Sequence, residues 1–171
     1  MRQAEEAGFS SALRAYHLRR GKFLRPAPGV YRLRWYPSWD REEVMVAWLW
    51  AGRDRAVVSH ESALDLLSLG EVIPDATHLT VPRRARSLVG ERPDVRIHTS
   101  MRVFRPEDLS WVNGMRVTNP TRSIADYSRA GGRPDQVEKM VAEGRARGVL
   151  GVSDVERFPA TIESLVGQST G

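Results

Sequence analysis

The sequence predicts an α+β protein: a winged helix-turn-helix over residues 1–36, followed by a mixed α/β domain over residues 40–166. Two short helical segments precede a hairpin near the start of the chain, and strand and helix patterns alternate along the rest. With 171 residues, 41% of them hydrophobic, the chain is large enough for one or two hydrophobic cores. We therefore expect one or two domains.

The N-terminal region predicts two helices separated by a tight turn. Residues 2–7 favour a helix, and Gly8-Phe9-Ser10 interrupts it. Ser10 or Ser11 is a suitable cap for a second helix that runs to about Arg20 and ends at Gly21.

A β-hairpin is expected directly after the second helix. The turn formers of residues 26–29 precede an alternating strand over residues 30–35. Alternation puts Tyr31, Leu33 and Trp35 on a face expected to pack, and Val30, Arg32 and Arg34 on a face expected to show charge.

Residues 36–40 are interpreted as a linker, after which helices and strands alternate. Asp40 is expected to cap a helix over residues 41–51, and Ser59 one over residues 60–69. Asn119 should cap a third, with Pro120 at its first position, that ends near Arg129. A further helix over residues 135–147 precedes an end that looks frayed from Gly167.

The expected strands of this region cover residues 56–58, 77–81, 95–99, 109–112 and 115–118, and residues 82–86 form a basic loop. The last two strands pair through Asn113-Gly114, a dipeptide typical of two-residue hairpin turns.

Composition limits the class of protein. There is no cysteine, and the longest apolar stretch, near residues 44–51, is too short to span a bilayer. The charged first residues do not resemble a signal peptide, so we expect a cytoplasmic protein without a membrane partner. The net charge of +5 makes a polyanion the first partner to consider.

No catalytic, cofactor or metal site is expected. His17, His60, His78 and His98 lie far apart in the sequence, so each is interpreted as a surface or packing residue. Ser59 to Ser62 contain hydrolase residue types, but neighbours in sequence cannot form a triad, and capping explains the serines better. Glycine-rich phosphate loops are absent, and Asp154 with Glu156 is interpreted as surface charge at a helix start rather than a Mg²⁺ site.

One group of residues does indicate a function, because the second expected helix and the hairpin after it are both basic. In a winged helix-turn-helix the second helix enters the major groove, and the wing contacts the flanking backbone. The candidate DNA-binding residues are Ser11, Arg14, Tyr16, His17, Arg19, Arg20, Lys22, Arg25, Arg32 and Arg34. The alternative is a solvated basic face whose arginines reflect a GC-rich genome.

Four segments, in order, resemble the AbiEi-like antitoxins and transcriptional regulators of type IV toxin–antitoxin systems. They are Gly8 to Ser10 with the following helix, Gly29 to Leu33, Ser59 to Leu64 with His78 to Pro82, and Val117 to Asp126. The resemblance implies a winged helix that binds DNA at its own promoter and a C-terminal antitoxin-type domain that counters a nucleotidyltransferase-like toxin.

Two points qualify the expected roles. The family's winged helix usually begins with one more helix, so either the chain is truncated at its start or its winged helix is incomplete. Arg122 and His60, which lie in the matching segments, are interpreted as packing residues, and Arg122 can reach Asp126 one helical turn away.

Three functions therefore compete. The first is an autoregulating antitoxin, and the second a stand-alone transcriptional regulator whose C-terminal domain senses a signal or binds another protein. The third is an enzyme on nucleic acid, whose acids and lysine would be Asp135, Glu138 and Lys139, although these stand too close together for the usual nuclease pattern.

Overall fold

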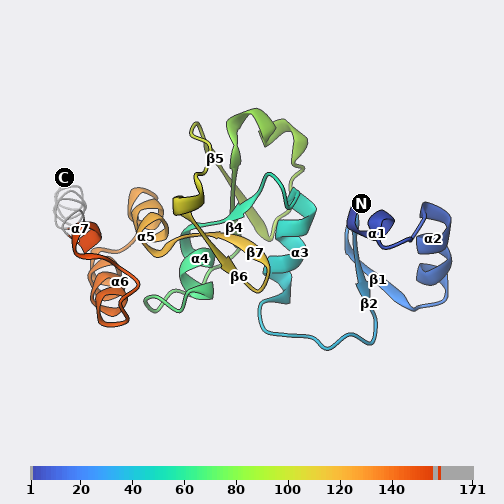
Figure 1. Ribbon diagram of the computed structural model, residues 1–171, viewed down its shortest axis with the longest axis horizontal. Helices are drawn as coiled ribbons and strands as arrows, with labels where there is room; N and C mark the ends of the chain where they lie inside the picture. The colour runs from blue at the N-terminus through green and yellow to red at the C-terminus, as the bar shows by residue number, and fades with distance from the viewer. Residues whose placement is uncertain (1, 156–157, 159–171) are drawn as a thin grey trace.

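Two separate β-sheets organise the described residues, 2–155 and 158, of the computed structural model (Figure 1). One sheet has two strands and belongs to the N-terminal unit, and the other has five. Helices pack on both sheets, so the chain is a mixed α+β protein, as predicted.

The N-terminal unit consists of α1 (Arg2–Glu6), α2 (Ser11–Arg19), β1 (Phe23–Ala27) and β2 (Val30–Leu33). Ser10 caps α2, because its hydroxyl accepts a hydrogen bond of 3.2 Å from the amide of Leu13. Gly21 ends the helix with a φ of 65°, a conformation that favours glycine. These observations confirm the expected pair of helices and the hairpin.

The predicted faces of this hairpin are wrong. Val30 is buried, whereas Leu33 is 53% exposed and Trp35 85% exposed. The pairing of β1 with β2 is irregular between Leu24 and Ala27, and β2 ends at Leu33. Trp35 therefore lies in a turn beyond the strand, where alternation no longer determines which way a side chain points.

An irregular connection leads from β2 to α3 (Glu42–Ala51), the helix between the two sheets (Figure 1). Asp40 is not its cap, contrary to expectation. Arg41 occupies the N-cap position with a φ of 65° and makes no side-chain cap, because a guanidinium has only donors and cannot accept from the helix amides. It forms an ion pair with Asp65 of the following helix instead.

The large sheet contains β3 (Val57–Val58), β4 (Thr77–Pro82), β5 (Val95–Ser100), β6 (Leu109–Val112) and β7 (Met115–Thr118). Their order is β5-β4-β3-β7-β6, with parallel pairs β4 with β5 and β3 with β7, and antiparallel pairs elsewhere. The predicted hairpin through Asn113 and Gly114 is confirmed, and both turn residues have positive φ, 50° and 77°.

The helices cover both faces of the large sheet. α3 lies on one side, and α4 (His60–Leu66), α5 (Pro120–Arg129) and α6 (Pro134–Ala146) lie on the other, followed by α7 (Val152–Val155) (Figure 1). The expected loop at 82–86 is instead a 3₁₀ helix, η1 (Arg83–Leu88), and a second one, η2 (Pro106–Asp108), precedes β6. Gly167 lies outside the described residues.

Two hydrophobic cores result. One joins α3 to the sheet through Val44, Trp48, Val58, Leu79 and Val117. The other joins α4, α5 and α6 and contains Leu64, Ile124, Val137 and Met140. The expected cap of α5 is confirmed, since the amide oxygen of Asn119 accepts a 2.7 Å hydrogen bond from the backbone amide of Arg122.

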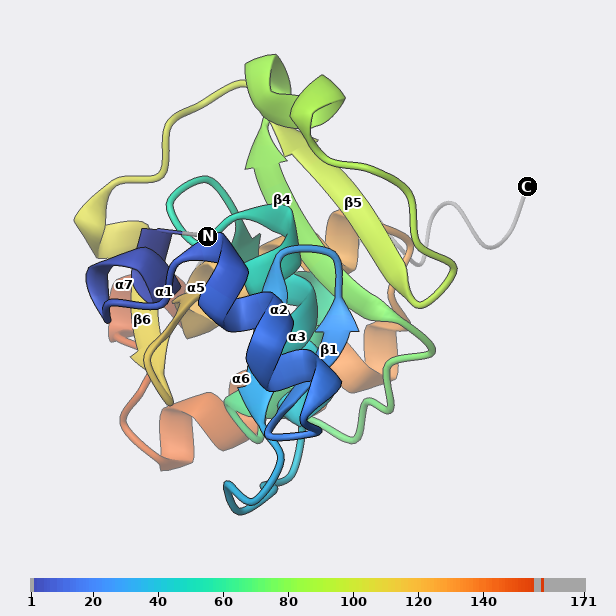
Figure 2. The same ribbon diagram turned by 90° about the vertical axis from the view of Figure 1, so that its right-hand side faces the viewer.

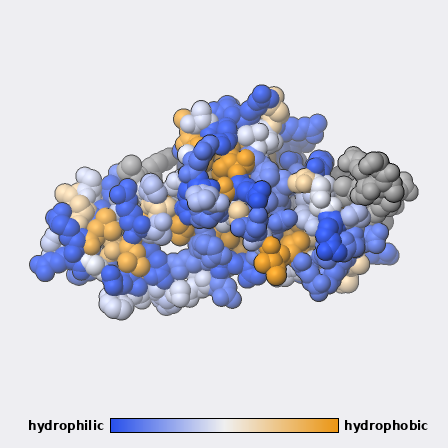
Figure 3. All heavy atoms as spheres, turned by 180° about the vertical axis from the view of Figure 1, so that it is seen from behind, coloured by the Kyte–Doolittle hydropathy of each residue, from blue (hydrophilic) through white to orange (hydrophobic). Residues whose placement is uncertain are grey.

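The surface seen from behind is mainly hydrophilic, with apolar residues in separate patches (Figure 3). Among the described helices, none has both the length and the apolar character needed to cross a bilayer.

Candidate functional sites

The outer surface of the N-terminal unit carries most of the predicted DNA-binding residues. α1 and α2 lie on the far side of the hairpin from α3, and no other element lies in front of them (Figures 1 and 2). Most of the candidates are exposed: Ser11, Tyr16, Arg19, Arg20, Lys22, Arg25 and Arg34. His17 is partly buried, with its ring 5.1 Å from that of Phe23.

Three cations meet where α2 runs into the hairpin, and we call Arg20, Lys22 and Arg34 the cationic corner. The amide of Arg34 donates a 2.9 Å hydrogen bond to the carbonyl of Lys22. The guanidinium of Arg34 lies beside Gly21, 3.6 Å from the position that a Cβ would occupy there. In the described part of the chain no carboxylate forms an ion pair with these three side chains, so their charges face solvent.

Two predicted DNA-binding arginines are instead held within the protein. The expectation that Arg14 lies on the open basic face is wrong, because Arg14 is only 4% exposed. It donates a 2.6 Å hydrogen bond to the carbonyl of Phe9, lies 3.5 Å from a carboxylate oxygen of Glu5 and stacks over Tyr31. Arg32 forms an ion pair with Glu42 of α3 and donates to the carbonyl of Tyr36 at 2.8 Å.

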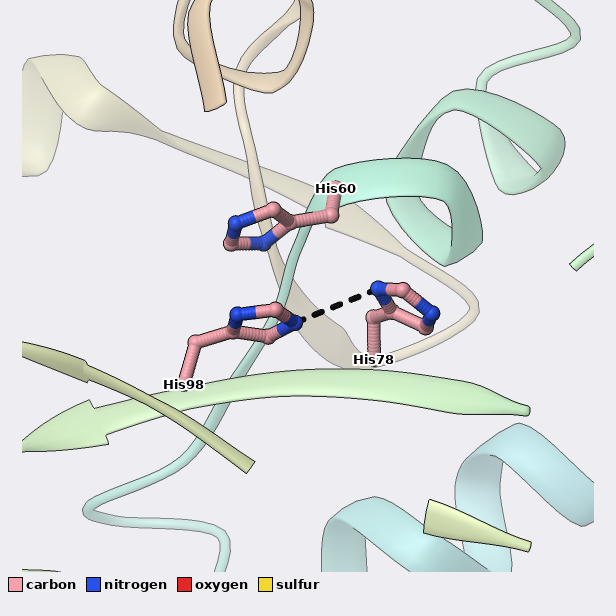
Figure 4. A group of neighbouring side chains, drawn as sticks. All are labelled: His60, His78 and His98. Atoms are coloured by element: carbon pink, nitrogen blue, oxygen red, sulfur yellow. Dashed lines mark hydrogen bonds between the residues drawn. The ribbon is translucent and has the colours of Figure 1, made fainter. Parts of the chain in front are cut away.

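The second site is a cluster of three histidines in the C-terminal part (Figure 4). The expectation that the histidines stand apart is wrong for His60, His78 and His98. Each offers one ring nitrogen to a group whose atoms all lie within 4.8 Å of one another. Separation in sequence misled the prediction, because strand pairing brings His78 and His98 together across 20 positions, and the start of α4 places His60 beside them.

Strand register explains how two of these rings meet. β4 and β5 run parallel with His78 opposite Arg96 and Thr80 opposite His98. His78 and His98 are therefore diagonal neighbours on one face of the sheet, within reach of each other's rings. Nε2 of His98 lies 3.2 Å from Nδ1 of His78.

His60 reaches the same point from the start of α4. Its backbone has a φ of 54°, a strained value for a residue with a Cβ. Ser59 is at the N-cap position but does not cap, because its hydroxyl bonds to Nδ1 of His60 at 2.9 Å and to the hydroxyl of Thr80 at 2.7 Å. The ring of His60 stacks on that of His98 with centroids 3.7 Å apart.

Burial keeps the three rings neutral. Burial, assisted by the neighbouring histidines and by Arg122 and Arg129, lowers the pKa of His60 to about 3. Burial and His98 lower the pKa of His78 to about 4, against the opposing effect of Asp75. Burial also lowers the pKa of His98, which Asp126 partly offsets. Neutral imidazoles have lone pairs available for a metal ion.

A pocket of about 280 Å³ opens beside His60 and His98 and is lined on its other side by α5. There Arg122 donates to both carboxylate oxygens of Asp126 at 2.9 Å, which confirms the predicted contact. Arg129 lies 3.2 Å from the same carboxylate. Two guanidinium groups and one carboxylate leave this wall positively charged.

Two acids lie behind His78, on the side away from His98. Nε2 of His78 is buried and is 3.9 Å from an oxygen of Glu61 and 3.9 Å from one of Asp75. Burial and the charge of Asp75 raise the pKa of Glu61, whereas the hydrogen bond from Arg96 lowers that of Asp75.

Of the three residues considered for nuclease chemistry, Lys139 and Asp135 form ion pairs, and Glu138 is exposed on α6. Lys139 contacts Glu71 at 2.5 Å and Asp135 contacts Arg133 at 2.7 Å, both on the surface of α6 or beside it. Asp154 accepts a 3.1 Å hydrogen bond from the amide of Gly151, and Glu156 lies outside the described residues.

Sequence reasoning missed the histidine cluster, although one signal was available. His78 and His98 lie in two consecutive expected strands, and His60 begins the helix that precedes them, so pairing of those strands brings the rings together. The chain matches no protein-family model and none of the curated proteins with which it was compared.

Proposed function

We propose that this chain is a cytoplasmic DNA-binding transcriptional regulator whose N-terminal unit acts as a winged helix-turn-helix. The cationic corner carries the proposal, because exposed charges from the C-cap of α2 and from the two residues that flank the hairpin strands lie on one outer surface, without carboxylate ion pairs in the described part of the chain. A phosphate backbone is the partner that such a surface favours.

The arrangement of the N-terminal unit supports different roles for α2 and for the hairpin in DNA binding. α2 is placed on the open side of the molecule, where its exposed side chains would face the major groove (Figure 2). Lys22, Arg25 and Arg34 follow on the hairpin and would contact phosphates beside it. Arg14 and Arg32 would stabilise the unit rather than bind DNA.

A salt titration of DNA binding tests this proposal. The chain should bind a duplex from its own promoter more tightly than an unrelated duplex of equal length, with affinity that falls steeply with salt. Replacing Arg20, Lys22 and Arg34 together by alanine should lower the salt slope by about three units, since each lost phosphate contact accounts for about one.

Arg145→Ala is the matched control. Arg145 is exposed in the last turn of α6, far from the N-terminal unit, and its replacement removes one positive charge from the chain, compared with three in the triple variant. Its slope should equal that of the wild type. Equal, weak binding of both duplexes, or an equal loss in the control, would contradict the assignment.

We propose further that the regulator is the antitoxin of a type IV toxin–antitoxin system, as the family resemblance implies. It would repress its own promoter and counter a nucleotidyltransferase-like toxin encoded beside it, without itself being an enzyme. Co-expression with the neighbouring gene should restore growth of cells that the toxin arrests. Absence of rescue would contradict the antitoxin role.

The second candidate is a stand-alone regulator whose C-terminal part senses a signal. The pocket beside His60 and His98 favours this candidate, because it offers a ligand site on the part of the chain that does not carry the cationic corner. Promoter binding without growth rescue would support it over the antitoxin.

A further inference from the structure

We propose that His60, His78 and His98 form a zinc site with one open coordination position. Three elements, the start of α4, β4 and β5, each supply one ring (Figure 4). The site belongs to the large sheet and does not depend on the N-terminal unit or on DNA binding.

The ring nitrogens are close to the spacing that zinc needs. Tetrahedral coordination with bonds of about 2.0 to 2.1 Å places ligand nitrogens about 3.4 Å apart. His98 Nε2 and His78 Nδ1 are 3.2 Å apart, and a nitrogen of His60 completes a group within 4.8 Å. The ring of His60, now stacked on that of His98 with an angle of 16° between their planes, must turn toward the ion.

Hydrogen-bonding groups stand behind two of the three ligands. Metal-bound histidines usually donate their second ring N–H to a carboxylate or another oxygen, which fixes the tautomer. Nδ1 of His60 contacts the Ser59 hydroxyl at 2.9 Å, which leaves its Nε2 for the ion. Nε2 of His78 is buried without a hydrogen-bond partner, 3.9 Å from both Glu61 and Asp75, so one of these carboxylates must move closer to accept from it. Nδ1, which lies 3.2 Å from Nε2 of His98, is then the ligand atom of His78.

The chemistry of the ligands selects the class of ion. Three imidazoles suit zinc and neighbouring transition metals, whereas magnesium and calcium prefer oxygen ligands. Three protein ligands leave a fourth position for water or another molecule. Two of the three ligands, His60 and His98, line the pocket of about 280 Å³, where the guanidinium groups of Arg122 and Arg129 favour an anionic fourth ligand.

Titration of the untagged, chelator-treated chain with zinc, followed by calorimetry, tests the site. One ion per chain is expected, and cobalt added in place of zinc should give the visible spectrum of a tetrahedral site. His98→Gln should weaken zinc binding by at least about 100-fold, because loss of an outer partner alone costs about 10- to 100-fold.

His17→Gln is the matched control, since His17 is the one histidine of the chain outside the cluster. It should bind zinc like the wild type. Failure of the wild type to bind one ion, or an equal loss in both histidine variants, would overturn the proposal.

A second pair of variants keeps the test decisive if His98→Gln does not fold. Glu61→Gln leaves all three ligands in place but removes one of the two carboxylates behind His78, and it should weaken zinc binding by about tenfold. Glu91→Gln removes an equal charge from a side chain that is 92% exposed, and it should have no effect. Equal affinities of these two variants would contradict the proposed carboxylate-supported site. The outcome is independent of DNA binding, which none of these measurements involves.

Discussion

Arg14 and Arg19 lie five residues apart in α2 but have different surroundings. Arg19 is exposed and has no ion-pair partner in the described part of the chain, whereas Arg14 is buried beneath the helix. Two nitrogens of the buried guanidinium have partners, the carbonyl of Phe9 for Nη1 and the carboxylate of Glu5 for Nη2, whereas Nε has no hydrogen-bond partner among the described residues. Arg14 therefore connects α2 to the preceding turn and to α1.

Arg14→Ala should lower the free energy of unfolding by about 1 to 3 kcal/mol, because it removes a charge-assisted hydrogen bond and leaves the Phe9 carbonyl without that donor. Arg19→Ala should change it by less than about 0.5 kcal/mol, as is usual for exposed positions. Urea unfolding followed by circular dichroism measures both. Equal midpoints for the two variants would show that Arg14 has no stabilising role.

Single residues were predictable where the relevant neighbours are close in sequence. The contact between Arg122 and Asp126 follows from helical spacing alone, and the structure contains it. The burial of Arg14 was not predictable in this way, because it depends also on Tyr31, which reaches it only after the hairpin folds against α2.

At the scale of elements, α5 is specified by local signals. Asn119 caps it, Pro120 occupies its first position, and the preceding hairpin turns through Asn113 and Gly114. The side-chain amide of Asn119 also donates a 2.6 Å hydrogen bond to the carbonyl of Glu107. α5 carries Arg122 and Asp126 to the pocket, so this cap helps to position one wall of the site.

Replacing Asn119 should therefore affect stability through the cap. Asn119→Ala should cost about 1 to 2 kcal/mol, because the amide of Arg122 loses its acceptor. Asn119→Ser should cost clearly less, since a serine hydroxyl can still accept that bond. Thermal unfolding compares the two, and an equal loss in both variants would show that the contact with Glu107 matters more than the cap.

Elements whose positions depend on distant partners were predicted less well. Among the described strands β2 pairs with β1 alone, and it ends at Leu33, opposite the first residue of β1, so the expected packing of Trp35 fails. The parallel register of β4 with β5 places His78 beside His98, and no turn or cap near either residue encodes it. The strands could be expected from the sequence, but the histidine site that they build could not.

At the scale of the whole molecule, α3 joins the two parts of the chain. One side of α3 packs on the large sheet, and its first turn contacts the hairpin through the ion pair of Glu42 with Arg32. A groove of about 780 Å³ runs between the hairpin and α3 and is lined by Tyr31, Trp39 and Leu49. The ion pair is therefore a main polar contact between the hairpin and α3, which are separated in part by this groove.

Loss of this ion pair should loosen the N-terminal unit from α3. Glu42→Gln removes the carboxylate that holds Arg32, and the segment from Trp35 to Trp39 should then be cut several-fold faster by chymotrypsin. Trp35, which is 85% exposed, provides the cleavage site.

Glu43→Gln is the control, because Glu43 is the next residue of the same first helical turn and is exposed. Both variants remove one negative charge near the N-terminus of α3, so their effects on the helix dipole should be alike. Only the loss of Glu42 should speed cleavage. Equal cleavage rates for the two variants would show that apolar contacts alone hold the hairpin on α3. The ion pair between Arg32 and Glu42 would then have no part in orienting the cationic corner.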